Sequence, residues 1–261
     1  MNILKMICMA FSTYSRIPMP QVKWEDKNAE YVICFYPLVG LVVGAAEAIL
    51  LYLFQSKGFP ALVIALLALA IPILISGGIH LDGLIDTADA RHSYLPKEEK
   101  LRILKDPHVG AFGVIRLVLY LILMLSGLLL IAEQIPERGW ELLTYAVVIP
   151  FWSRAVCALT VVWFPKAKKD GMLQAVTGGK QIIQTLLLCV WGVAGIAIFL
   201  WQIPIGPEWI RIPVWILADA LLVVRYRRMA IKEFGGVSGD LAGWLLCMLE
   251  LVAVAVLIPH F

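Results

Sequence analysis

Three aspartates that directly follow an apolar segment have a spacing suited to metal-assisted chemistry. They are Asp82, Asp86 and Asp89, within the run Gly77-Gly-Ile-His-Leu-Asp-Gly-Leu-Ile-Asp-Thr-Ala-Asp-Ala90. In a helix of 3.6 residues per turn, these positions lie within about 60° of arc on one face. Like charges about 6 Å apart repel by roughly 2 to 3 kcal/mol at an effective dielectric of about 20, and a cation removes that cost. Carboxylate oxygens suit Mg²⁺ or Mn²⁺, so the run predicts a metal site for a phosphate-bearing substrate.

A solvated acidic helix face is the alternative interpretation of the same spacing. The neighbouring residues Leu81, Leu84, Ile85 and Ala88 are apolar, and the run adjoins a candidate transmembrane segment. Three carboxylates in register at such a boundary favour the metal site.

Several other polar residues are weaker candidates for chemistry. The stretch Leu104-Lys-Asp-Pro-His-Val-Gly-Ala-Phe-Gly113 is typical of a loop that approaches a phosphate closely, and in it Asp106 is either a fourth ligand, a general base or a turn-capping residue. The turn Gly235-Gly-Val-Ser-Gly-Asp240 either receives an anion at a helix N-terminus or only caps that helix. His80 and Arg91 can take part only if the aspartate helix begins and ends beside them.

Three charged residues lie inside apolar segments. Arg154 is costly in lipid and is expected to face the interior of the bundle or a cavity, unless it snorkels. Glu47 and Glu250 are functional candidates for the same reason, but the sequence names no partner for either.

The elements that position these residues are those of a polytopic membrane protein. Of the 261 residues 61% are hydrophobic and only 16% are charged, which excludes an ordinary soluble domain. We expect an all-α bundle in a single membrane domain, residues 1–261, with about seven spans. The expected spans are 31–54, 59–79, 113–132, 141–163, 182–203, 209–225 and 241–258.

The basic residues lie mainly in alternate connections between these segments. Lysines and arginines gather before the first span and after the second, fourth and sixth, whereas the opposite connections hold only Lys57, Arg138 and Arg211. The positive-inside rule then predicts a cytoplasmic N-terminus, with the active-site segment 80–112 on the cytoplasmic side of a bacterial or archaeal inner membrane. Seven of the eight aspartates fall on that side, Asp219 being the exception.

The first residues are predicted to form an interfacial amphipathic helix rather than a signal peptide. Leu4, Ile7, Cys8 and Phe11 recur at helical spacing, and Ser12 to Ser15 interrupt the apolar run. We therefore place residues 1–30 at the cytoplasmic surface. The five cysteines are scattered without a C-x-x-C pair, which argues against zinc sites and disulfide scaffolds.

Taken together, these motifs resemble the cobalamin-5′-phosphate synthase family, the adenosylcobinamide-GDP ribazoletransferases. The motifs are Ser15-Arg-Ile-Pro-Met-Pro20, Phe35-Tyr-Pro-Leu-Val-Gly40, the H-L-D-G-x-x-D-x-x-D core of the Gly77–Ala90 run, Lys105-Asp-Pro-His-Val-Gly110 with Phe112-Gly113, and Gly235-Gly-Val-Ser-Gly-Asp240. Two residues depart from the family pattern. Ala90 stands where glycine is common, and Pro107 where a small polar residue is usual.

The resemblance implies transfer from adenosylcobinamide-GDP to α-ribazole or its 5′-phosphate, with release of GMP. It implies Mg²⁺, or alternatively Mn²⁺, on Asp82, Asp86 and Asp89, and a proton acceptor such as Asp106. Asp82 is also assigned a catalytic role. The implied partners are these substrates, membrane lipids and other cobalamin-assembly enzymes, with no nucleic acid. The candidates for binding substrate are His80, Arg91, Lys105, His108, Arg154 and Asp240.

Three rival functions share part of this pattern. A CDP-alcohol phosphotransferase would need an aspartate three residues before Asp82 and paired aspartates downstream, which the chain lacks. A membrane prenyltransferase would be expected to carry a second aspartate-rich motif, but Asp106 stands alone. A cation transporter would place more charge at the middle of the bilayer, whereas most of these acids gather at one surface.

Overall fold

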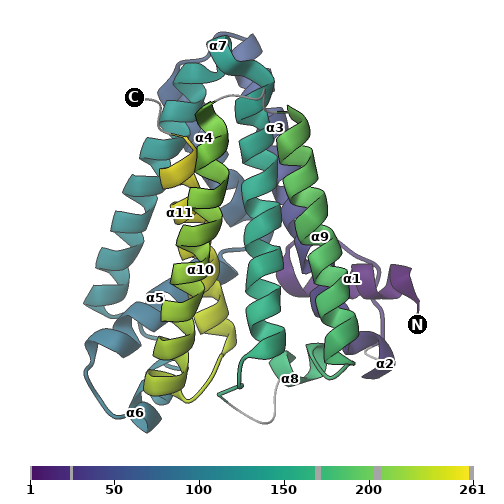
Figure 1. Cartoon of the computed structure of the whole chain (residues 1–261). Helices are drawn as coiled ribbons and strands as arrows, with labels where there is room; N and C mark the ends of the chain where they lie inside the picture. Colours follow the sequence, from purple (N-terminus) through teal and green to yellow (C-terminus); the bar gives the residue numbers. More distant parts are fainter. Residues whose placement is uncertain (1, 24–25, 168–171, 203–206, 259–261) are drawn as a thin grey trace.

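The computed structural model is a bundle of helices, and it describes residues 2–23, 26–167, 172–202 and 207–258 (Figure 1). The expected all-α class is confirmed, because no strand occurs in these ranges. Lys168, Lys169 and Asp170, which belong to the connection after the fourth expected span, lie outside these ranges. In chain order the α-helices are α1 Ile3–Tyr14, α2 Asp26–Ala29, α3 Tyr36–Ser56, α4 Ala61–Ser76, α5 Ile79–His92, α6 Lys97–Ile103, α7 Ala111–Trp163, α8 Met172–Val176, α9 Gln181–Gln202, α10 Arg211–Met229 and α11 Gly239–Leu257.

The helices that could cross a membrane are fewer than the seven expected segments. By length and composition, the described helices α3, α7, α9 and α11 qualify, and α4 with α5 forms a fifth if that bent pair is one span. Helix α10 does not pass the same test. The chain is a membrane protein, but the count of seven is not confirmed.

Helix α7 turns back on itself and so forms two legs (Figure 1). Its 53 residues are interrupted at Gly139, whose φ of 36° and ψ of −108° are not helical. A straight helix of that length would measure about 80 Å, far more than a bilayer core of about 30 Å. The two legs correspond to the separate segments expected at 113–132 and 141–163.

A sharp break at two glycines directs α5 away from α4. Gly77 and Gly78 have φ values of 69° and 81°, in the left-handed region that glycine adopts without strain. The break turns the chain by 90°, so α5 leaves the direction of the apolar helix α4. In Figure 1, α5 and α6 lie toward the same end of the bundle as α8, away from the turn of α7. The aspartates of α5 are therefore carried by a helix that lies across this end.

Close packing of α5 on α11 brings the Gly235–Asp240 turn to the aspartates. A Cβ atom at Gly83 would lie only 2.4 Å from the backbone oxygen of Asp240, so glycine permits the approach. Gly243 faces the backbone of His80 in the same contact. The first turn of α11 thus meets the first turn of α5.

The N-terminal segment forms the helix expected there. In α1, Met6, Met9, Ala10 and Phe11 are buried, whereas Ile3 and Leu4 are 62% and 70% exposed. One face therefore packs on the bundle while apolar side chains remain outside. This arrangement fits a helix at a membrane interface.

Candidate active site

Four carboxylates gather where α5 meets α11. Asp82, Asp86 and Asp89 are all within the continuous helix α5, as the spacing predicted, and Asp240 joins them from the first turn of α11. Burial, reinforced by the charges of Asp82, Asp240 and Asp89, raises the pKa of Asp86 to about 7. The carboxylates are therefore close enough to repel one another.

Asp89 has a structural role that its position in the sequence does not reveal. Its Oδ2 accepts a hydrogen bond from the Gly110 amide and its Oδ1 one from the Gly113 amide, each at 2.8 Å. A Cβ atom at either glycine would lie 2.5 Å from an Asp89 oxygen. Asp89 therefore caps the N-terminus of α7, where a negative charge also complements the helix dipole. Its predicted role as a metal ligand stays a prediction.

The donor set at this junction suits a hard divalent cation. Asp82, Asp86 and Asp240 supply carboxylate oxygens, and a positive charge among them would relieve the repulsion that, after burial, raises the pKa of Asp86. Within the described ranges, no three His, Cys, Asp or Glu side chains already stand as a ready-made metal site. The side chains would therefore have to adjust around the ion.

The raised pKa of Asp86 predicts a pH-dependent stability. The unfolded chain binds a proton at this group with a pKa near 3.8, whereas the folded protein does so near 7. The folded state holds more protons in this window, so the contribution of Asp86 to stability is present below about pH 4 and is lost as the pH rises through about 7.

Without divalent cations, the melting temperature of the wild type should therefore fall relative to that of Asp86→Asn as the pH rises from 5 to 8. Differential scanning fluorimetry in detergent micelles measures it. Added Mg²⁺ at pH 8 should raise the melting temperature of the wild type more than that of Asp86→Asn. Equal pH profiles for the two proteins would contradict the raised pKa of Asp86.

Asp106 and His108 form a local pair in the exposed loop before α7. Oδ1 of Asp106 accepts hydrogen bonds from the His108 amide at 2.9 Å and from its Nδ1 at 2.7 Å. These bonds hold the pKa of Asp106 below its usual value. Lys105 is exposed in the same loop, and Gly110 at the end of the loop bonds to Asp89. The loop is thus tied to the aspartate helix two residues after His108.

Arg91 lies at the end of α5, which is the position that a role in the site requires, but it already has an ion-pair partner. Its Nε is 3.4 Å from Oε1 of Glu233, whose Oε2 is 2.8 Å from Nζ of Lys100. Glu233 belongs to the π-helical turn Ala230–Phe234 that joins α10 to the Gly235–Asp240 turn. The pairings connect α5, α6 and that turn. A role of Arg91 in binding substrate stays a prediction.

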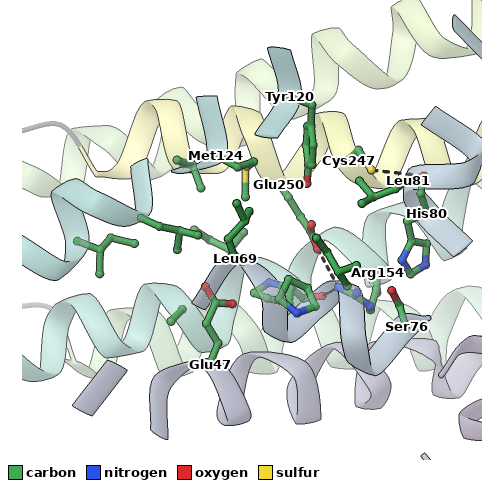
Figure 2. A pocket seen from close by; sticks show the side chains of 18 residues that line it. Glu47, Leu69, Ser76, His80, Leu81, Tyr120, Met124, Arg154, Cys247 and Glu250 are labelled. Carbon is green, nitrogen blue, oxygen red and sulfur yellow. Dashed lines mark hydrogen bonds and ion pairs between the residues drawn. The ribbon is translucent and has the colours of Figure 1, made fainter. Parts of the chain in front are cut away.

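His80 and Arg154 are buried and belong to a polar network beside an internal cavity (Figure 2). Nε2 of His80 is 2.6 Å from the hydroxyl of Tyr36, and the Arg154 guanidinium lies 5.8 Å from the centre of the Tyr36 ring. Nη1 of Arg154 donates to the Pro150 carbonyl and to Oε1 of Glu250, each at 2.9 Å. Arg154 is 1% exposed and does not snorkel. Its partner Glu250 could not be named from sequence, because 96 residues separate the two.

Glu47 lines the same internal cavity as Arg154, His80 and Glu250 (Figure 2). Residues of both legs of α7 also line it, among them Tyr120 and Met124 from the first leg and Ile149 from the second. The cavity therefore lies inside the bundle, directly inward of the helix that carries the aspartates. The roles of Glu47 and Glu250 were not predicted, and only the pairing of Glu250 with Arg154 is resolved by the contacts.

Comparison with known proteins identifies the family. The family described as Cobalamin-5-phosphate synthase matches residues 6–258, almost the whole chain. The chain belongs to this family. A relative from Lachnoclostridium phytofermentans, named adenosylcobinamide-GDP ribazoletransferase, is 39% identical over 257 residues, which cover 97% of this chain and 93% of the relative.

Other relatives with the same name support the assignment. One from Desulfitobacterium hafniense strain Y51 is 34% identical over 260 residues, which cover 97% of this chain and 96% of the relative. One from Clostridium perfringens strain 13 is 30% identical and covers 97% of each. No solved structure matches the chain. The resemblance in the motifs is thus confirmed, and the chain is an enzyme of the transferase class in cobalamin biosynthesis, like other Cobalamin-5-phosphate synthase members.

Proposed function

We propose that the chain transfers the phosphocobinamide part of adenosylcobinamide-GDP to α-ribazole or α-ribazole 5′-phosphate and releases GMP. The convergence of Asp82, Asp86 and Asp240 at one end of a membrane bundle carries the proposal, because a diphosphate donor needs cations held at such a place. The names of relatives that cover nearly the whole chain support the choice of substrates.

The reaction exchanges one phosphorus–oxygen bond for another. A hydroxyl of the ribazole sugar attacks the phosphorus nearer the cobinamide, a new bond forms there, and the bond to the bridging oxygen breaks. The electron pair of the broken bond leaves with GMP, and the hydroxyl proton passes to a base. Mg²⁺ bound by Asp82 and Asp86, with Asp240 or Asp89, would supply charge neutralisation for the diphosphate.

The chain's own groups supply the rest of the chemistry. An aspartate whose pKa is lowered is a weak base at neutral pH. Oδ1 of Asp106 would instead hold the His108 imidazole through its Nδ1, so that the other ring nitrogen accepts the hydroxyl proton. Lys105 in the same loop and Arg91 at the end of α5 would hold phosphate oxygens. Arg91 would exchange its contact with Glu233 for the substrate.

The membrane placement belongs to the same proposal. The basic residues of α6 and the loop before α7 lie at the aspartate end of the bundle, which under the positive-inside rule supports a cytoplasmic position for that end. We propose that the membrane is the inner membrane. Both substrates would then reach the site from the cytoplasm.

A transfer assay tests the proposal directly. Purified full-length protein in lipid nanodiscs is incubated with adenosylcobinamide-GDP and α-ribazole 5′-phosphate, and GMP is quantified by chromatography. We expect GMP to appear only when acceptor and Mg²⁺ are both present, and chelation by EDTA to stop its release. Transfer that continues unchanged in EDTA would refute the metal role. Absence of transfer with either acceptor, with Mg²⁺ or Mn²⁺, would refute the function.

A further inference from the structure

A second cavity lies beside the aspartates, on the side of the N-terminal helix. It measures about 240 Å³ and is bounded by residues of α1, α3, α5, α7, α8 and α11 and of the 3₁₀ turn Val32–Phe35. Asp82 and Asp240 line it together with Thr13, whereas Ile33, Val161, Leu173 and Ala242 provide aliphatic wall. Two of the carboxylates proposed to hold the cation thus line a cavity whose other walls are largely apolar.

The remaining wall of this cavity is aromatic. Tyr14 and Tyr36 line it with their ring centres 4.4 Å apart, and His80 lines it beside Tyr36. The Tyr36 hydroxyl and Nε2 of His80 bond to each other, and the Cys157 thiol donates to the Ala242 carbonyl. These polar groups already have hydrogen-bond partners in the protein, so a ligand need not provide one. Aromatic and aliphatic surface with polar groups at one end is typical of a site for a small organic molecule.

We infer that this cavity binds the acceptor, with its methylated benzimidazole base against Tyr14, Tyr36 and the aliphatic wall and its sugar hydroxyls toward Asp82 and Asp240. The inference rests on the proposed function and adds where the acceptor sits. It directs a sugar hydroxyl toward the carboxylates that would hold the cation on the donor's diphosphate, and in-line attack requires the two reacting groups to be close together.

The chemistry of the cavity wall favours the base of the acceptor over the guanine and the corrinoid of the donor. Guanine carries hydrogen-bonding groups around most of its edge, and burying them against Ile33, Val161 and Leu173 would leave them unsatisfied, which is unfavourable. The outer edge of a dimethylbenzimidazole carries only methyl groups and loses nothing there. A corrinoid is far larger than a cavity of about 240 Å³. The acceptor base is therefore the part of the substrates that this cavity fits.

One glycine allows the cavity to be filled without disturbing the fold. Gly239 is the first residue of α11 and lines the cavity, and a Cβ atom built on it meets no other atom within 4 Å. Its φ lies outside the left-handed region, so a side chain there introduces no backbone strain. Gly239→Val and Gly239→Leu should therefore project into the space assigned to the base.

The test compares how each variant handles the two substrates. In the GMP assay with full-length protein in nanodiscs, we expect Gly239→Val to raise the KM for α-ribazole at least tenfold and Gly239→Leu to raise it further, with the KM for adenosylcobinamide-GDP within twofold of wild type. Titration calorimetry with α-ribazole alone should show the same loss of affinity. Val193→Leu, which adds a methylene on the exposed face of α9, is the control and should leave both KM values unchanged.

The outcomes separate this inference from the proposed function. If wild type transfers but Gly239→Leu, with a normal melting temperature, keeps its KM for α-ribazole, the acceptor binds elsewhere and the inference is wrong while the function stands. If the KM for the donor rises instead, the cavity holds part of the donor and the inference is equally wrong.

If Gly239→Leu misfolds, a second variant decides. Leu173→Ala enlarges the same cavity and should lower the KM for a bulkier diethylbenzimidazole nucleoside. No change in that KM would overturn the inference.

Discussion

Replacement of Asp82 by asparagine is expected to reduce GMP release at least 100-fold, in the range of about 10²–10³ seen when one electrostatic stabiliser is removed from an active site. Asp82 lies in the first turn of α5, adds to the repulsion on Asp86 and lines the acceptor cavity beside Asp240. Its charge is therefore placed to act on both the donor's cation and the acceptor hydroxyl. Asparagine keeps the shape and removes the charge.

The measurement is turnover at saturating substrates across a range of Mg²⁺ concentrations. The variant should remain in the membrane with a melting temperature near that of wild type, and its residual activity should need more Mg²⁺. Glu98→Gln is the matched control, because Glu98 is an exposed acid in α6 at the same end of the bundle. Near-normal turnover in Asp82→Asn would show that this carboxylate does not hold the metal.

Replacement of Arg154 by methionine is expected to produce the largest loss of stability, about 3–5 kcal/mol, because it leaves the Glu250 carboxylate buried without its positive partner. The ion pair of 2.9 Å is enclosed in the bundle, with 1% of the Arg154 side chain and 9% of that of Glu250 exposed (Figure 2). Among the residues that the structure describes, Ser153 would remain to donate to Oε1 of Glu250, at 3.3 Å. One hydroxyl cannot replace a guanidinium next to a buried charge.

A double-mutant cycle separates this effect from loss of packing. The variants Arg154→Met, Glu250→Leu and their combination are compared by melting temperature and by the monodisperse fraction in detergent. The double variant should be clearly more stable than Arg154→Met alone, because it buries no unpaired charge. Arg116→Met, at an exposed position of α7, is the control for removal of an arginine. Additive losses in the cycle would mean that the pair contributes no coupling.

Local patterns in the sequence predicted much of the site, because they depend only on helix geometry. The spacing of Asp82, Asp86 and Asp89 placed them on one helix, and α5 contains all three. The apolar segments and the alternating basic connections predicted a membrane bundle, and the motifs predicted the family that the comparisons identify. The number of spans was less predictable, since α10 is weakly apolar and α4 with α5 is bent.

Contacts between distant segments were decided by the tertiary structure alone. Asp89 bonds to amides 21 and 24 residues away, Arg154 finds Glu250 96 residues away, and Asp240 meets α5 only because Gly83 lets α11 approach. Such pairings depend on which helix faces pack together, and helical periodicity says which residues share a face but not what that face meets. The sequence by itself thus determined the chemistry available to this protein. The packing of its helices decided which carboxylates gather at the junction of α5 and α11 and which one caps a helix.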